Sequence, residues 1–325
     1  MLVLSEKDMR NAVSYEEIMD AVEESFFLFV KKECKMTDRF TISHRGNTML
    51  YMPCFAGGYI GTKMLAEWPE NPKKGLPYLD GMMMLNNEQN GKVEAVMKGN
   101  VLTALRTGAV GGVAMRHLSE PDIHTVGVVG CGVQGLHQLC YACATRDVKK
   151  IYLYDSIKHD LRTFIDQLKN MIAPITVEIS VCENVEKLVE KSEVIITATQ
   201  AVEPVLPNNP DKLRGKLIIA IGSWKPTMRE IPDAIWEVVD EVYTELPYAC
   251  EESGDLSQPL DSGLLREEQV KYMGDFLMEK KLGNDHKLGK TRFYKSVGMG
   301  IFDTMVAKCI YLSAIEKGLG QKVNW

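Results

Sequence analysis

Apolar and polar residues alternate along the first third of the chain in a way that predicts both helix and sheet. A helix is predicted to begin after Ser14, because Ser14 and Glu17 have the spacing of a capping box and the apolar residues that follow share one helical face. Asn90-Gly91 favours a hairpin turn, and residues 103–118, rich in small side chains, predict a second helix. Short apolar runs predict strands at residues 48–52, 59–65, 82–85 and 93–97.

From about residue 120 the pattern changes to buried strands that alternate with helical stretches or loops. A regular alternation of strand and helix is typical of a parallel, doubly wound sheet. Residues 253–292 are polar and contain glycine, which indicates loops and short helices at the surface. Residues 296–319 predict a long helix that is apolar all round, so we expect it to be buried between domains and to return to the first domain. The predicted strands of this part are residues 126–129, 151–154, 175–181, 194–198, 217–221 and 241–244.

The length, composition and charge of the chain indicate how many domains it has and which kinds of partner it does not bind. The chain has 325 residues, 45% of them hydrophobic and 25% charged, which fits a protein with two domains that each bury a core. A net charge of -6 without a dense basic block argues against binding to nucleic acid or to an anionic membrane. No apolar run reaches the roughly 20 residues needed to cross a bilayer, and residues 1–10 carry charges rather than an apolar leader. The sequence thus predicts a soluble, cytoplasmic protein.

The cysteines do not indicate a metal site. Cys140 and Cys143 form a CxxC pair, but this pair lies in a predicted helix and no second pair completes a zinc site. We therefore expect reduced cysteines that pack as small apolar side chains, and no bound metal.

The motif Gly130-Cys-Gly132-Val133-Gln134-Gly135 follows a predicted strand and opens a predicted helix. In this context GxGxxG is typical of a dinucleotide-binding turn, whose glycines allow the tight turn, the approach of the pyrophosphate and the close packing of helix on strand. The helix N-terminus supplies N–H donors and partial positive charge for the phosphates. These residues are predicted to bind the cofactor.

Asp155 indicates which dinucleotide is bound. It ends the next predicted strand, 20 residues beyond Gly135, where a carboxylate accepts hydrogen bonds from the ribose 2′-OH and repels a 2′-phosphate. Residues 156–158 include a single basic residue, Lys158, so NAD is favoured over NADP. The strand ends expected to line the same crevice are Thr197, Ala198, Thr199, Gly222 and Ser223.

Two basic residues of the first part stand in apolar surroundings. Lys63 lies within the predicted strand Tyr59–Leu65, and Arg106 lies in a helix otherwise made of small residues. Charges seldom occupy such places unpaired. A bound carboxylate would pair both, and arginine offers a bidentate fork for one. The alternative is that each side chain is paired internally or extends to solvent.

In chain order the sequence contains Arg39, Leu50-Tyr-Met-Pro53, Gly61-Thr-Lys63, Gly99-Asn-Val-Leu-Thr-Ala-Leu-Arg106-Thr-Gly-Ala, the glycine motif, Lys295-Ser-Val-Gly298 and Asp303. This order resembles the ornithine cyclodeaminase/mu-crystallin family, and the resemblance runs through nearly the whole chain. It implies a Rossmann NAD-binding domain of residues 119–303, inserted into an α+β dimerisation and substrate-binding domain of residues 1–118 plus about 304–325. It also implies a homodimer.

The resemblance also implies roles for individual residues. Lys63 and Arg106 would be catalytic, and Arg39, Met52, Lys63 and Arg106 would bind the substrate. Arg45 is an alternative to Arg39, because it follows closely in the sequence. Besides the glycine motif, the residues that would contact the cofactor are Thr107, Ser296, Val297 and Gly298.

One departure from the family bears on the reaction. Ornithine cyclodeaminases carry a catalytic Asp in the segment that corresponds to Gly222–Arg229, and this chain has no acid there. The sequence therefore favours an NAD-dependent amino-acid dehydrogenase or ketimine reductase that transfers a hydride at the α-carbon of a small L-amino acid or its cyclic imine. Ornithine cyclodeaminase, which recycles its NAD, remains an alternative and would need another base. The third hypothesis is a non-catalytic protein that binds a dinucleotide or a small ligand. The possible replacement bases are Glu67, Asp303 and Glu230.

Overall fold

A computed structural model describes residues 1–157, 160–283 and 288–324, which form two compact units. The first comprises Met1–Arg106 and Met299–Trp325, and the second comprises Thr107–Gly298. Both boundaries differ from the predicted ones at 118 and 303. The first boundary lies inside one continuous helix, α3 (Gly99–Leu118), where the sequence pattern has no break.

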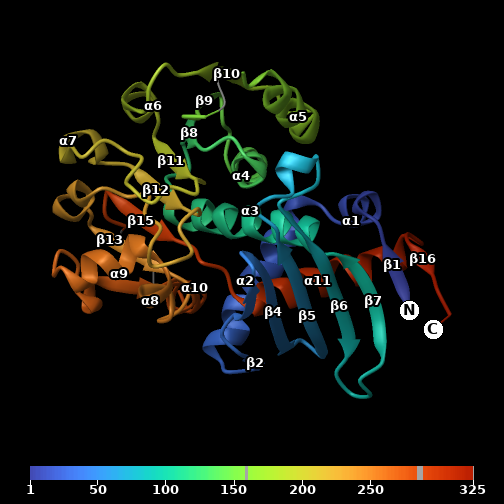
Figure 1. Cartoon of the computed structure of the whole chain (residues 1–325). Coiled ribbons are helices and arrows are strands. Elements are labelled where there is room, and N and C mark those ends of the chain that lie inside the picture. Colours follow the sequence, from blue (N-terminus) through green and yellow to red (C-terminus); the bar gives the residue numbers. More distant parts are fainter. Residues whose placement is uncertain (158–159, 284–287, 325) are drawn as a thin grey trace. The chain divides into compact units, whose positions relative to one another are not determined.

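The first unit is built on a mostly antiparallel sheet with the order β16-β1-β7-β6-β5-β4-β2, and β3 pairs with β4. Helices α2 and α11 pack against each other, and α11 also packs on β4, β5 and β6 (Figure 1). The elements of this unit are β1 (Leu2–Leu4), α1 (Glu6–Ala12), α2 (Tyr15–Val30), β2 (Cys34–Met36), β3 (Phe40–His44), β4 (Asn47–Ala56), β5 (Tyr59–Glu67), η1 (Pro72–Lys74), β6 (Leu79–Asn87), β7 (Val93–Lys98), the start of α3, α11 (Gly300–Glu316) and β16 (Gln321–Lys322).

Local signals in this unit are confirmed. Ser14 and Glu17 form the predicted capping box at the start of α2. Strands β6 and β7 form an antiparallel hairpin, and Gly91 in its turn has a φ of 71°. The long final helix begins at Gly300, later than predicted, and packs within the first unit.

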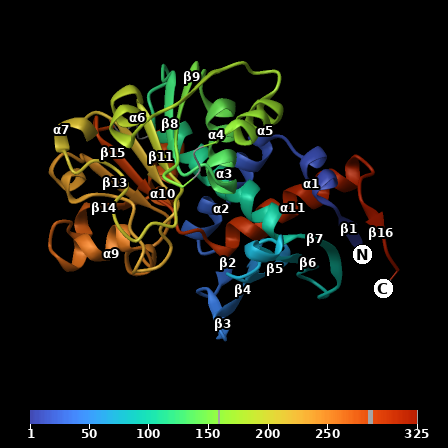
Figure 2. The same cartoon turned by 45° about the horizontal axis from the view of Figure 1, so that its top comes forward.

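The second unit contains a fully parallel sheet with the order β10-β9-β8-β11-β12-β15-β13-β14 (Figure 2). The strand order reverses direction at β8, as in a doubly wound Rossmann-type sheet, so the predicted fold class is confirmed. The elements are the end of α3, β8 (Thr125–Val129), α4 (Val133–Thr145), β9 (Lys150–Tyr154), α5 (Arg162–Ile172), β10 (Glu178–Val181), α6 (Val185–Lys191), β11 (Val194–Thr197), α7 (Pro210–Leu213), β12 (Leu217–Ala220), η2 (Asp233–Glu237), β13 (Glu241–Thr244), α8 (Ala249–Glu252), α9 (Gly254–Asp261), η3 (Glu267–Gln269), β14 (Val270–Tyr272), α10 (Met273–Lys281) and β15 (Arg292–Lys295).

The prediction of surface loops and short helices for residues 253–292 is wrong in one important respect. The segment contains β14 and leads into β15, a buried strand that pairs with both β12 and β13. Strand β15 reads Arg-Phe-Tyr-Lys, and its charged ends, Arg292 and Lys295, are both buried. Four residues with a charge at each end do not show the apolar run by which a buried strand is recognised.

Within the described ranges, no helix combines the length and the apolar character that crossing a bilayer requires.

Candidate active site

Lys63 lies on the face of the first unit's sheet that α11 covers. Alternate residues of β5 are buried, and Lys63 is 1% exposed. Its cross-strand neighbours are Met52 on β4 and Met83 on β6, and both of these are buried as well. The predicted substrate-binding Met52 therefore lies directly beside Lys63, and these two apolar neighbours cannot solvate the lysine ammonium.

Asp303, in the first turn of α11, joins Lys63 to Arg106. Its Oδ2 accepts a hydrogen bond from Lys63 Nζ at 2.6 Å, and its Oδ1 accepts one from Arg106 Nε at 3.1 Å. Asp303 is fully buried and Arg106 is 6% exposed. The structure thus favours the alternative that these two cations are paired internally, because the carboxylate that meets them belongs to the chain.

This environment lowers the pKa of Lys63 to about 7. Burial is the largest cause, and the positive charges of Arg106 and Arg39 act in the same direction, whereas Asp303 opposes them. A lysine that titrates near neutral pH can both donate and accept a proton, which is the requirement for a general acid or base.

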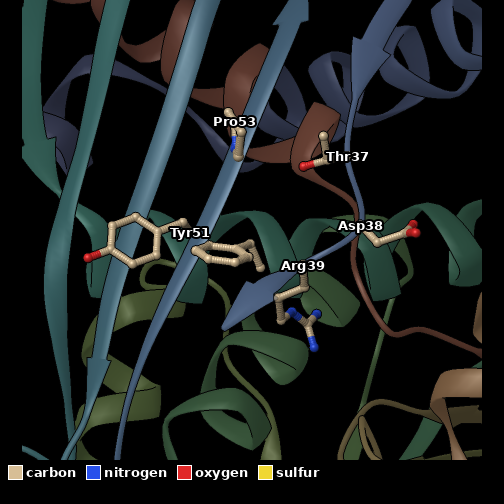
Figure 3. Close-up of a pocket in the computed structure, with 6 residues that line it drawn as sticks. Thr37, Asp38, Arg39, Tyr51 and Pro53 are labelled. Atoms are coloured by element: carbon tan, nitrogen blue, oxygen red, sulfur yellow. The ribbon is translucent and has the colours of Figure 1, made fainter. Parts of the chain in front are cut away.

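Arg39 lies in the segment between β2 and β3, in an open pocket that it shares with Tyr51 and Pro53 (Figure 3). Its charge acts on Lys63, although more weakly than that of Arg106. The alternative, Arg45, is exposed in the turn between β3 and β4 and has a φ of 51°. Arg39, unlike Arg45, therefore acts electrostatically on Lys63, although its pocket is lined by Tyr51 and Pro53, which alternate along β4 with Met52.

The second unit has the geometry of a dinucleotide-binding turn between β8 and α4. Gly130 has a φ of 98°, and a Cβ on Gly135 would lie 2.1 Å from the Gly130 carbonyl oxygen. A Cβ on Gly132 would meet nothing within 4 Å. The first and third glycines are therefore required by the chain's own packing, while the second borders open space at the N-terminus of α4, where a pyrophosphate can approach.

Asp155 follows β9 and accepts hydrogen bonds from the backbone N–H groups of Cys131, at 2.8 Å, and Ile157, at 2.9 Å. A carboxylate has about four acceptor sites, so its oxygens can still accept hydrogen bonds from a ribose. Lys158, the basic residue considered with it, lies outside the described residues.

Several buried polar atoms of the second unit have no hydrogen-bond partner among the described residues, and three of them belong to residues predicted to contact the cofactor. These three are Thr107 Oγ1 on α3, Gln134 Oε1 on α4 and Thr197 Oγ1 at the end of β11. Buried polar groups are nearly always satisfied, so these atoms indicate a polar ligand. Together with the open space at Gly132, they fit the predicted dinucleotide.

Glu230 connects the ends of β11 and β12. Its carboxylate accepts hydrogen bonds from Thr199 N at 2.6 Å, Thr199 Oγ1 at 2.8 Å and Gly222 N at 2.7 Å, and burial raises its pKa. The Ser223 hydroxyl is buried and donates to the Met228 carbonyl at 2.7 Å. Both oxygens of Glu230 are therefore engaged in holding the ends of β11 and β12 together. The Ser223 hydroxyl is engaged with Met228 and Ser253.

Sequence analysis missed Glu245, a buried acid that follows β13. Its carboxylate accepts hydrogen bonds from Ser296 Oγ at 2.5 Å and from the backbone N–H groups of Val297 and Gly298, each at 2.9 Å. Gly298 has a φ of 81°. Glu245 thus fixes the predicted cofactor-contacting segment after β15. An acid directly after a strand of a parallel sheet was the signal that could have identified it.

No group of three or more His, Cys, Asp or Glu side chains in the described ranges is arranged to hold a metal ion. Cys140 and Cys143 are buried in α4, and neither belongs to a disulfide.

The family model described as "Ornithine cyclodeaminase/mu-crystallin family" matches residues 1–318. The chain belongs to this family. Its likeness to a member from Bacillus cereus, a Δ1-pyrroline-2-carboxylate reductase, extends over the full length of both proteins at 31% identity.

Two solved structures have the same fold as this chain. One is the Thermococcus litoralis Δ1-pyrroline-2-carboxylate reductase in complex with NADH and L-proline, with a TM-score of 0.88 and 30% identity over 99% of this chain and 100% of that one. The other is an archaeal alanine dehydrogenase dimer with bound NAD, with a TM-score of 0.87 and 27% identity over 100% of this chain and 99% of that one.

Proposed function

We propose that this chain is an NAD(H)-dependent oxidoreductase that reduces a small cyclic imino acid, or oxidises the corresponding L-amino acid, at the α-carbon. The observation that carries the proposal is the buried cluster of Lys63, Arg106 and Asp303, in a chain whose other unit has a dinucleotide-binding turn. The named activities of the reductase from Bacillus cereus and of the two solved relatives are of this class.

The charges of the first unit fit one substrate carboxylate. Lys63, Arg106 and Arg39 bring positive charge, and Asp303 brings one negative charge. Asp303 engages Arg106 through Nε, so the two terminal nitrogens of that guanidinium can form a bidentate pair with a carboxylate. In this proposal Arg106 binds the substrate carboxylate directly, and the positive charge of Arg39 attracts the same carboxylate electrostatically.

Lys63 would move the proton of the reaction. Nicotinamide, when bound, donates or accepts the hydride at its C4, and reduction of a C=N bond also requires one proton at nitrogen. With a pKa near 7, the Lys63 ammonium can donate that proton in the reductive direction, and the neutral amine can accept it in the oxidative direction. Lys63 would thus be the general acid and base.

The same charges disfavour ornithine as the substrate. Its side-chain ammonium would bring a further positive charge to the cluster of Lys63, Arg106 and Arg39. Asp303 already binds two cations, and Glu230 binds backbone donors in the other unit. Glu67, the third possible replacement base, is buried further along β5 and is not part of the cluster. We therefore place ornithine cyclodeaminase second.

We further propose that the enzyme is a homodimer that associates through the uncovered face of the first unit's sheet. Tyr51, Met64 and Met82 are paired across β4, β5 and β6 and point away from α11, and Met82 is 43% exposed. A row of large apolar side chains on a sheet face is typical of an interface. The alanine dehydrogenase relative is a dimer, which supports the proposal.

Assays in both directions test the function. The purified protein is incubated with NADH and Δ1-pyrroline-2-carboxylate while absorbance is followed, and separately with NAD and L-proline, L-alanine or L-ornithine while NADH and ammonia are measured. Oxidation of NADH by the imine is the expected result. Release of ammonia from ornithine without net NADH would show the cyclodeaminase instead, and no reaction with imines or amino acids would contradict the proposal.

A further inference from the structure

Asp303 is held in place by contacts on two sides of α11. Phe302, the residue before it, packs edge-on against Phe26 of α2 with ring centroids 5.0 Å apart. Thr304, the residue after it, lies so close to β5 that a Cβ on Gly61 would be 2.3 Å from its Oγ1. The carboxylate between these two anchors therefore has little freedom to move, which distinguishes it from the long side chains of Lys63 and Arg106.

Each oxygen of the Asp303 carboxylate accepts a hydrogen bond from a different cationic side chain. Oδ2 binds Lys63 Nζ, and Oδ1 binds Arg106 Nε. The bond to Nε does not involve the two terminal nitrogens of the guanidinium, and the bond to Nζ fixes the end of a side chain that otherwise has many rotamers. The distance and orientation between the two cations are thus set by one carboxylate.

We propose that Asp303 is the positioning residue of the active site, which holds the Lys63 amine and the outer edge of Arg106 in the relation that one imino acid requires. The inference rests on the proposed function for the identity of the substrate. Arg106 takes the substrate carboxylate, Lys63 meets the α-nitrogen, and Asp303 contacts both side chains without contacting the substrate.

The charges around Lys63 determine the direction in which its pKa should change when Asp303 is replaced. Those that act on it come from Asp303 on α11, Arg106 on α3 and Arg39 ahead of β3, while its cross-strand neighbours, Met52 and Met83, are neutral. Asp303 raises the pKa of Lys63 against burial and the arginines. Removing the negative charge therefore moves the titration of Lys63 to lower pH.

Asp303→Asn is compared with Glu316→Gln, which removes a negative charge from the exposed end of the same helix. In reduction of Δ1-pyrroline-2-carboxylate, we expect Asp303→Asn to move the alkaline limb of the kcat–pH profile toward acid by at least about one pH unit. At pH values above the limb, kcat would then be about tenfold lower than in the wild type. The Kd for NADH should stay unchanged. Glu316→Gln should behave as the wild type.

A second variant separates position from charge. Asp303→Glu keeps the negative charge but moves the carboxylate by one methylene group, so we expect kcat to fall at least about tenfold while the alkaline limb stays within half a unit or so of the wild type. Full activity of Asp303→Glu, or an unshifted limb in Asp303→Asn, would overturn the proposal.

A measurement without turnover keeps this inference distinct from the proposed function. The 13Cε signal of Lys63, assigned by its loss in Lys63→Met, is titrated in lysine-labelled protein. We expect a midpoint near pH 7 in the wild type and a lower one in Asp303→Asn. If the wild type reduces no imine, the proposed function fails while this titration still tests the pairing, and equal midpoints in both proteins would refute the role of Asp303.

Discussion

At the scale of single residues, the protein's chemistry depends on placing charge where water is excluded. Lys63 and Arg106 are almost fully buried, and one carboxylate, Asp303, compensates both. Within this cluster two cationic side chains share one carboxylate, and an anionic substrate, as proposed above, would bring the second negative charge.

Lys63→Met tests whether the lysine is catalytic. Methionine has a similar length and suits the apolar surroundings of Met52 and Met83, so the protein should fold, and Asp303 keeps Arg106 as its partner. We expect imine reduction to fall by about 100-fold or more, with the Kd for NADH unchanged in a fluorescence titration. Lys92→Met, at an exposed position in the β6–β7 turn, is the control, and wild-type turnover in Lys63→Met would remove the lysine from the mechanism.

The titration of Lys63 predicts opposite pH dependence for the two directions of the reaction. Burial lowers the pKa of Lys63 to about 7. The protonated form donates in reduction, so the reductive rate should fall as pH rises through about 7, and the oxidative rate, which needs the neutral amine, should rise over the same range. Measurement of kcat in both directions on either side of pH 7 checks this, and parallel profiles would contradict it.

At the scale of elements, the turn between β8 and α4 separates glycines needed for folding from one needed for binding. We expect Gly132→Ala to leave Tm unchanged and to raise the Kd for NADH at least about tenfold, because its methyl group enters the space open to the pyrophosphate. Gly135→Ala should instead cost about 3 kcal/mol of unfolding free energy, because its Cβ would overlap the Gly130 carbonyl. Calorimetry gives the Tm of both variants, and titration with NADH gives their Kd. Equal effects of the two substitutions on Tm would contradict the separate roles of Gly132 and Gly135.

At the scale of the whole molecule, the uncovered sheet face predicts the oligomeric state. Met82→Glu places a charge in the row formed with Tyr51 and Met64, so light scattering should show the mass of one chain where the wild type shows two. Leu282→Glu is the matched control, because Leu282 is also exposed but belongs to the second unit. A wild-type protein of single-chain mass, or a Met82→Glu protein that remains a dimer, would exclude this interface.

Features that depend on neighbours in the chain could be predicted from the sequence alone. The capping box at Ser14 and the strand–glycine turn–helix at Gly130 form between residues that are close together in sequence. The local sequence pattern is therefore enough to predict them. The acid at Asp155 has its place relative to the glycines set by one strand and one helix. The fold class and the prediction of a dinucleotide site followed from features of this kind.

Other features were decided only by the tertiary structure, because they join residues far apart in the chain. Lys63 and Asp303 are 240 positions apart, and Arg106 and Asp303 are 197 apart, so no local pattern could show that one internal carboxylate pairs both cations. Strand β15 is recognisable only by its two neighbours in the sheet. The sequence by itself determined that buried charges needed a partner, since an unpaired charge is too costly to bury, and the fold of the first unit decided which residue that partner is.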